Sequence, residues 1–226
     1  MPENQEAVRK IGDELDRAAL LFRIAGAGAT LQFIVLKWAE VSLGMSLSEG
    51  AILQAVVAVG VAAGAIIAAS RVPLKKSLSV LPVGIMMGIA VMLMAFYTKH
   101  LFPEHWGIYF GRMHVPGYLL VAYLFLMIVG GLSGFFVVPM NALLQHRGHV
   151  LLSAGHSIAV QNFNENLSVL VMLCLYAVLV WLDVPVGAVI VLFGTFVCLM
   201  MWVVMRRHQA NQRAFDSVAL IGEMRH

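Results

Sequence analysis

Long apolar runs alternate with short polar connections along most of the chain. Crossing a hydrocarbon core about 30 Å thick takes roughly 20 helical residues. Six runs reach that length, at residues 20–43, 51–70, 78–97, 118–144, 155–181 and 185–205. The pattern predicts an all-α, polytopic membrane domain over residues 20–205, with an amphipathic segment before it at 1–19 and a basic tail after it at 206–226.

The composition agrees with this pattern. Hydrophobic residues make up 61% of the 226 residues and charged residues 12%, against roughly 45–50% and about 25% in soluble domains. Lipid is therefore the expected solvent for most of the chain. The net charge of +3 does not indicate nucleic acid as a partner, because the basic residues of a membrane protein mainly report its topology.

The basic residues divide unevenly between the two ends of the predicted spans. Twelve lysines and arginines fall in the termini and in the second and fourth connections, whereas only Lys99 and Arg112 fall in the connections on the opposite side. By the positive-inside rule, both termini are predicted to be cytoplasmic. The first nineteen residues are then compatible with an amphipathic helix on the cytoplasmic membrane surface, and equally with a solvated helix that has one apolar face.

The fifth run contains an unusual group of polar residues. At about 100° per residue, Gln161, Asn162, Glu165 and Asn166 fall within one arc of a helix, opposite an apolar side. A rise of about 1.5 Å per residue puts Glu165 roughly 15 Å along that helix, where a carboxylate must face a cavity, a partner or a proton.

Asn141 and Gln32 are expected at a similar depth in two other spans. The predicted substrate-binding and translocation layer therefore comprises Glu165, Gln161, Asn162, Asn166, Asn141 and Gln32. Amides between membrane helices also serve simply as interhelical contacts, and this alternative stays open for the asparagines and Gln161.

Glycine and proline suggest how the helices pack and bend. The pairs Gly60/Gly64, Gly84/Gly88 and Gly130/Gly134 are each four residues apart, a spacing that lets helix backbones approach closely. Pro139 lies inside the fourth run and cannot donate a backbone hydrogen bond there. Together with Gly130, Gly131 and Gly134, it forms a predicted conformational hinge.

The charged and metal-ligating residues outside this layer do not predict a metal site or a catalytic site. Lys37 and Glu40, three residues apart near the outer end of the first span, are typical of an ion pair at the membrane interface. His146 and His149 lack a nearby carboxylate ligand, and Cys174 and Cys198 form no close-spaced pair, so no metal or cofactor is predicted. The sequence contains no serine-hydrolase, zinc-protease or P-loop motif, so we predict that the protein is not an enzyme.

Three stretches resemble a known family. They are "GFFVVPMNALLQHRG" (134–148), "AGHSIAVQNFNEN" (154–166) and "GAGATLQFIVLKW" (26–38). They are similar to the carboxy-terminal half of bacterial lysophospholipid transporters, the LplT group of the major facilitator superfamily.

The resemblance implies one six-helix half of such a transporter in the bacterial inner membrane. It implies movement of lysophospholipid, chiefly lysophosphatidylethanolamine, from the outer to the inner leaflet, where an acyltransferase and acyl-carrier-protein synthetase re-acylates it. Taken with the chemistry of the polar layer, it suggests that Glu165 meets the headgroup ammonium while the five amides bind phosphate or glycerol oxygens.

The chain departs from the family in two ways. Family members have twelve helices, so the expected partner is a separate amino-terminal half or a second copy of this chain. Some members also carry arginine where this chain has Gln32, and glutamine cannot neutralise a phosphate. Two alternatives remain: half of a small-solute carrier of the same superfamily, proton-coupled through Glu165, and a non-transporting fragment or assembly subunit.

Overall fold

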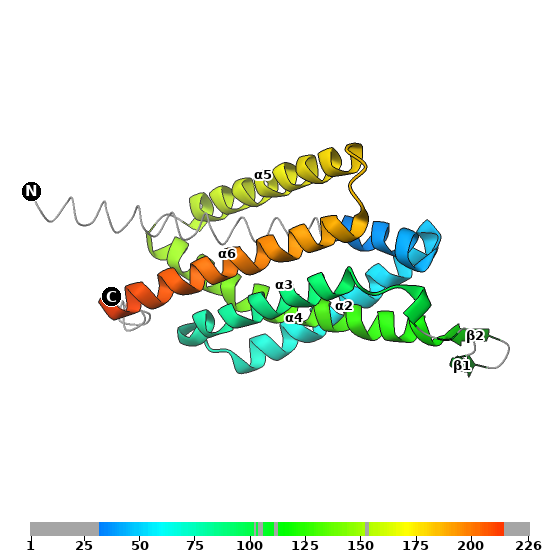
Figure 1. Cartoon of the computed structure of the whole chain (residues 1–226). Helices are drawn as coiled ribbons and strands as arrows, with labels where there is room; N and C mark the ends of the chain where they lie inside the picture. The colour runs from blue at the N-terminus through cyan, green and yellow to red at the C-terminus, as the bar shows by residue number, and fades with distance from the viewer. Residues whose placement is uncertain (1–31, 102, 104–105, 111–112, 152–153, 215–226) are drawn as a thin grey trace, which may run out of the picture.

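The structure, a computed structural model, describes residues 32–101, 103, 106–110, 113–151 and 154–214. These residues form a bundle of helices that run along a common direction, with a β-ribbon projecting from one end (Figure 1). The first helix comprises residues 32–38 and a π-helical turn, η1 (Ala39–Leu43). The α-helices that follow are α2 (Leu47–Arg71), α3 (Leu81–Met94), α4 (Gly117–Leu151), α5 (Ala154–Trp181) and α6 (Val186–Ala214). Short 3-10 helices, η2 (Leu74–Val80) and η3 (Lys99–Leu101), lie between them.

Four of the described helices are long and apolar enough to cross a membrane, over Ser48–Arg71, Lys76–Met94, Gly117–Leu143 and Val186–Arg207. α5 is a continuous helix of 28 residues, and the part of it whose side chains the structure describes without a gap contains the apolar stretch Asn166–Trp181. Residues 32–43 of the first predicted span are helical, whereas residues 20–31 lie outside the described part, as do the predicted amphipathic segment 1–19 and residues 215–226. The chain is thus a multi-pass, predominantly α-helical membrane protein.

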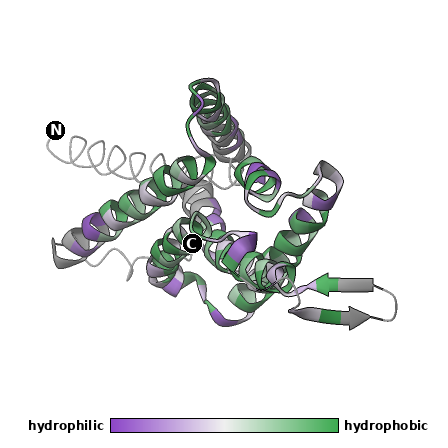
Figure 2. Cartoon of the chain, turned by 45° about the vertical axis from the view of Figure 1, so that its right-hand side comes forward, coloured by the Kyte–Doolittle hydropathy of each residue, from purple (hydrophilic) through white to green (hydrophobic). Residues whose placement is uncertain are grey.

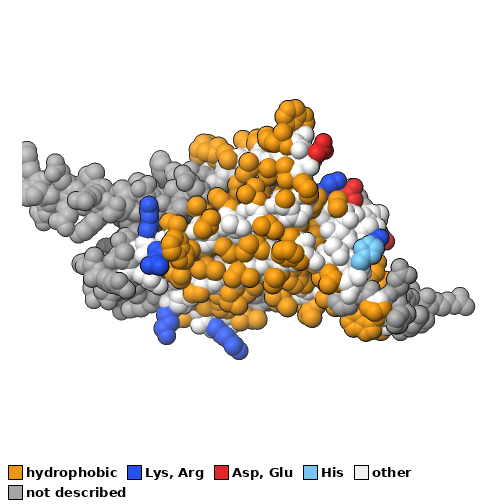
Figure 3. All heavy atoms as spheres, viewed as in Figure 1, with side chains coloured by type: hydrophobic (Ala, Val, Ile, Leu, Met, Phe, Trp, Pro, Cys, Tyr) orange, Lys and Arg blue, Asp and Glu red, His pale blue; other side chains and the backbone are white. Residues whose placement is uncertain are grey.

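Charge and hydropathy follow the length of the bundle. Apolar colouring predominates along the helices (Figure 2), and a wide band of hydrophobic side chains separates the charged groups at the two ends (Figure 3). α2 and α6 reach their carboxy-terminal parts at the same end of the bundle (Figure 1), and Arg71, Arg206 and Arg207 belong to these parts; we call this the basic end. The opposite end carries the β-ribbon and is called the ribbon end (Figure 1).

A tight connection joins the first helix to α2 at the ribbon end. Gly44 has a φ of 68° and so ends the first helix in the left-handed conformation that glycine adopts without strain. Ser46 then caps α2: its hydroxyl accepts from the Glu49 N–H at 3.4 Å, and its own N–H donates to the Glu49 carboxylate at 2.8 Å. This reciprocal capping box satisfies two backbone donors and fixes where α2 begins.

Glycines bring α2 and α4 into direct backbone contact. A β-carbon added at Gly60 or Gly64 would overlap the carbonyl oxygen of Met127 or Gly131 on α4, respectively. Gly134 has the same relation to the carbonyl oxygen of Val61 on α2. The sequence-based prediction of close packing at these glycines is therefore confirmed.

A second glycine contact joins α3 to α6. A β-carbon at Gly88 would lie 2.6 Å from the Cys198 sulfur and 3.0 Å from the Gly194 carbonyl oxygen. One at Gly84 would meet the Met201 side chain at 2.8 Å. The predicted packing role of Gly84 and Gly88 is also confirmed.

The β-ribbon was not predicted from the sequence. β1 (Gly107–Phe110) pairs antiparallel with β2 (Met113–Pro116), with Ile108 opposite Val115. The ribbon is fastened to α4 by the Gly117 N–H, which donates to the Trp106 carbonyl at 2.7 Å. Four-residue strands are too short to show alternation, although the two-residue connection beginning with Gly111 is typical of a hairpin.

Two helices also extend beyond their predicted ends. α4 continues to Leu151, and α6 continues through Arg206 and Arg207 to Ala214. The first part of the predicted basic tail, 206–226, is therefore helical and continuous with the last span.

The glycine contacts predict a selective effect of single methyl groups. We expect Gly134→Ala to lower the free energy of unfolding by about 1–3 kcal/mol, because the new β-carbon meets the α2 backbone, which cannot move aside as a side chain can. The measurement is thermal unfolding of the detergent-purified protein, followed by circular dichroism.

Gly131→Ala is the matched control on the same turn of α4. Its β-carbon would lie 3.7 Å from the Gly60 carbonyl oxygen, an ordinary contact, and alanine favours the helix over glycine. This variant should be at least as stable as the parent protein. Equal stability of both variants would contradict the proposed backbone contact.

Candidate functional site

The polar face of α5 lies near the basic end of the bundle. Asn162 and Asn166 are both exposed, and the Asn166 side-chain amide donates to the Asn162 backbone carbonyl at 2.8 Å. Their four-residue spacing puts them on one side of the helix, as predicted. Gln161 and Glu165 belong to the same helix, but their side chains lie outside the described part of the structure.

The apolar side of α5 is exposed as well. Leu167 is 45% exposed and Val171 58%, and both point away from Asn162 and Asn166. The described side chains of α5 that contact the core lie in the half near the ribbon end, where Met172 is buried and Tyr176 and Leu179 pack against the core. The first half of α5 therefore presents polar and apolar side chains on a helix that little of the described chain covers.

Gln32 and Asn141 do not join this face through hydrogen bonds. Both side chains are exposed, Gln32 on the first helix and Asn141 on α4. Among the described residues, no hydrogen bond links either of them to Asn162 or Asn166. The prediction that these residues form one layer with α5 remains a prediction.

Gln54 on α2 was missed in the sequence analysis. Its side-chain amide donates to the Gln32 backbone carbonyl at 2.5 Å, which ties α2 to the first helix. The available signal was a single glutamine inside the apolar run 51–70, because a lone amide in a membrane span must find a partner.

The predicted hinge residues lie in two packing environments. Gly130 and Gly134 are buried against α2, as described above. Pro139 is also buried, inside the continuous helix α4, one residue before Met140, which packs with Phe136 and Met201 in a second apolar cluster. The hinge role stays a prediction, and the glycines have a demonstrable packing role beside it.

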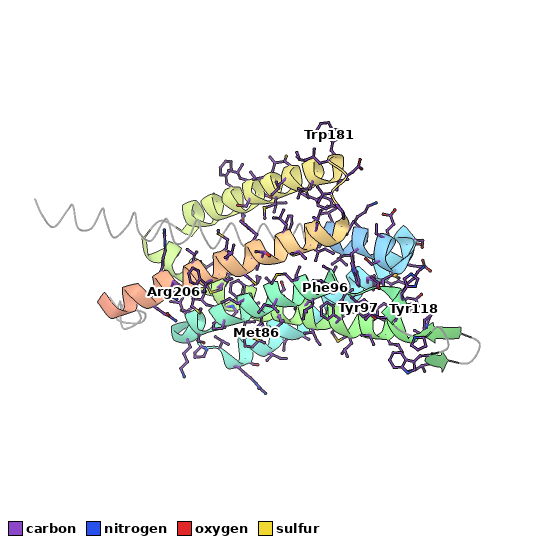
Figure 4. All side chains as sticks on the ribbon, viewed as in Figure 1. Met86, Phe96, Tyr97, Tyr118, Trp181 and Arg206 are labelled. Atoms are coloured by element: carbon purple, nitrogen blue, oxygen red, sulfur yellow. The ribbon has the colours of Figure 1, made fainter. Side chains whose placement is uncertain are left out.

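Charged and aromatic contacts cluster at the ribbon end. The Lys37 ammonium lies 2.9 Å from the Glu40 carboxylate, which confirms the predicted ion pair. The Tyr97 hydroxyl donates to the Tyr118 carbonyl at 2.6 Å, and the Tyr97 ring lies 6.0 Å from that of Trp38. Figure 4 shows Tyr97 and Tyr118 together at this end and Arg206 at the other.

The described residues contain no group of three or more histidine, cysteine or acidic side chains that could hold a metal ion. The side chains of His146 and His149 lie outside the described part.

Known lysophospholipid transporters are similar to this chain. The LplT protein of Escherichia coli O9:H4 (strain HS) is 39% identical over 187 residues, which are 81% of this chain and 42% of that protein. LplT of Escherichia fergusonii is 39% identical and LplT of Shigella boydii serotype 4 is 38% identical over the same extent. The chain thus spans less than half the length of these relatives, all of which are transporters rather than enzymes. No protein-family model matches the chain, and no solved structure matches it significantly.

These relationships, the membrane-spanning helices and the matched length lead to one conclusion. The chain is homologous to the bacterial lysophospholipid transporters LplT, over an extent consistent with one half of such a protein.

Proposed function

We propose that this chain is the carboxy-terminal half of a lysophospholipid transporter of the bacterial inner membrane, with both termini cytoplasmic. In this proposal it moves lysophosphatidylethanolamine from the outer to the inner leaflet, where an acyltransferase and acyl-carrier-protein synthetase re-acylates it. The observation that carries the proposal is the 39% identity to LplT over 81% of the chain.

The polar face of α5 supplies suitable chemistry for this cargo. A lysolipid needs polar contacts for its zwitterionic headgroup and an apolar surface for its single chain. α5 carries exposed Asn162 and Asn166 on one side, whereas exposed Leu167 and Val171 point away from them. In the proposal, Glu165 meets the headgroup ammonium, and the amides of Gln161, Asn162, Asn166, Asn141 and Gln32 bind phosphate and glycerol oxygens.

The exposed amides of this face also support the proposal that the chain has a protein partner. Exposed amides in the hydrocarbon region are costly unless water or protein satisfies them. A separate amino-terminal half, or a second copy of this chain, would cover the polar side of α5 and leave the apolar side to lipid. Pro139 and the neighbouring glycines of α4 would then let the assembled groove open to either face.

The first prediction concerns transport by reconstituted protein. The chain is placed in liposomes, alone or with a separately expressed amino-terminal half, and inward movement of fluorescent lysophosphatidylethanolamine is measured. We expect Glu165→Gln to slow this movement about tenfold, since a hydrogen bond to a charged group contributes about 1.5–3 kcal/mol.

Glu223→Gln is the matched control, because it removes a carboxylate from the tail instead. It should leave the rate unchanged, with equal amounts of both variants in the membrane. Unchanged transport by Glu165→Gln would remove Glu165 from the mechanism. No lysolipid movement by the wild-type chain in either setting, or competition by small polar solutes instead of lysolipid, would overturn the proposed function.

A second prediction concerns water access along α5. In a background with Cys174 and Cys198 replaced by alanine, Asn166→Cys should react with a hydrophilic maleimide at least tenfold faster than Leu167→Cys, which lies at nearly the same depth but points away from the polar face. Both positions are exposed in the described chain, so the difference reports whether water or lipid covers them. Equal rates at the two positions would contradict a water-accessible polar face.

A further inference from the structure

We propose that a pocket at the ribbon end is a binding site for the phosphoethanolamine headgroup of a lysolipid entering from the outer leaflet. The inference rests on the proposed function and adds to it a first docking point. The site is separate from the polar face of α5, because Val180 in its wall lies about 20 Å further along that helix than Asn166.

The pocket has a volume of about 310 Å³, at the lower end of the range for small-molecule sites. Three helices build it, each with residues from one face. Ile34, Lys37 and Val41 come from the first helix, Tyr176 and Val180 from α5, and Val186 and Val189 from α6; the α5–α6 connection adds Asp183, Val184 and Pro185.

The floor and the rim differ in character. Ile34 and Val189 are almost fully buried, at 1% and 2% exposure, whereas Val41 and Val180 are 59% and 44% exposed. The pocket thus has an apolar floor and an open apolar rim, which suits the first part of an acyl chain that continues into the membrane. Figure 3 shows acidic and basic side chains gathered at this end beyond the hydrophobic band.

Asp183 occupies a backbone position that ordinarily selects glycine. Its φ is 53°, and it is the one described non-glycine residue with a positive φ. The Val184 N–H donates to the Leu179 carbonyl and the Asp183 N–H to the Val180 carbonyl, both at 3.1 Å. This is a Schellman motif with Asp183 at its left-handed position, where glycine or asparagine is preferred. Aspartate tolerates this conformation better than most residues do, and the motif places Asp183 in the pocket lining.

The charges fit a zwitterion better than a simple anion. The Lys37 ammonium has three N–H donors, one of which is used in the ion pair with Glu40. The side chains of this pair are 39% and 60% exposed. Such an exposed pair contributes little stability, so the ammonium is free to bind a phosphate as well. The carboxylates of Asp183 and Glu40 would repel a free phosphate but attract a headgroup that also carries an ammonium.

Tyr176 also lines the pocket, together with Lys37, and its hydroxyl is a neutral hydrogen-bond donor. In the proposed complex, Lys37 and the Tyr176 hydroxyl bind the phosphate and Asp183 binds the ammonium, while the valines of the rim contact the chain.

The test compares two lysolipids with the same acyl chain. The full chain is purified in dodecyl maltoside, a nonionic detergent, and titrated calorimetrically with lysophosphatidylethanolamine or lysophosphatidylglycerol, which lacks the ammonium. We expect Lys37→Gln to weaken binding of both lipids about tenfold. Asp183→Asn should weaken lysophosphatidylethanolamine about tenfold and leave lysophosphatidylglycerol unchanged or tighter.

Two controls separate binding from folding. Asparagine suits the left-handed position, so Asp183→Asn should unfold at the same temperature as wild type or above it. Lys99→Gln removes an exposed lysine from the same end but outside the pocket, and should bind both lipids as wild type does.

The outcomes distinguish this site from the proposed function. If wild type binds lysolipid and neither Lys37→Gln nor Asp183→Asn changes the affinities, the pocket assignment is wrong and the transporter proposal stands. Equal weakening of both lipids by Asp183→Asn would also refute the assigned ammonium contact. If the wild-type protein neither binds nor moves lysolipid, both proposals fail.

Discussion

Backbone contact between α2 and α4 is the constraint on which the arrangement of the other helices depends. Between helices in lipid, burying apolar side chains gives little net attraction, because lipid tails are as apolar as leucine. Close approach through Gly60, Gly64, Gly130 and Gly134 gives instead the dense van der Waals contact that holds such helices together. Gly88 and Gly194 make the same kind of close contact between α3 and α6. The two tightly joined pairs leave the first helix and α5 attached mainly by side chains.

This uneven packing affects which parts of the chain can bend. Bending α4 at Gly130 or Gly134 would separate their backbones from α2, whereas Pro139 already lacks a backbone donor. Of the four predicted hinge residues, Pro139 is therefore the one at which the helix already lacks a backbone hydrogen bond, and its hinge role stays a prediction. Among the described side chains, those of α5 that pack against the core lie near the ribbon end, whereas Asn162 and Asn166 in its first half are exposed.

The sequence predicts well what depends on local spacing and poorly what depends on tertiary contact. The long helices and the glycine pairs follow from apolar runs and four-residue intervals, and the structure confirms them. Asn162 and Asn166 lie on one face because the helical period requires it. Helical phase says nothing of whether Gln32 and Asn141 approach α5, since that depends on how three helices pack.

Two features could be found only in the folded chain. In the sequence, Gln54 is a lone amide within an apolar run. Only the fold shows that the first helix places the Gln32 carbonyl beside it. Lys37 and Asp183 are far apart in the sequence, and neither stands out without the other. The fold brings them to one pocket because the first helix and α5 both end there, next to the start of α6.

α5 contributes to two polar regions, the face with Asn162 and Asn166 and the ribbon-end pocket. They differ in which molecules satisfy their polar groups. Asn162 and Asn166 share a helix with exposed Phe163 and Leu170, and a uniform hydrocarbon environment satisfies only the apolar pair. That region therefore needs water or further protein to satisfy its amides. The ribbon-end pocket is built entirely from this chain. A lysolipid headgroup would thus meet its first charged contacts on this half, and only the deeper path would depend on the partner.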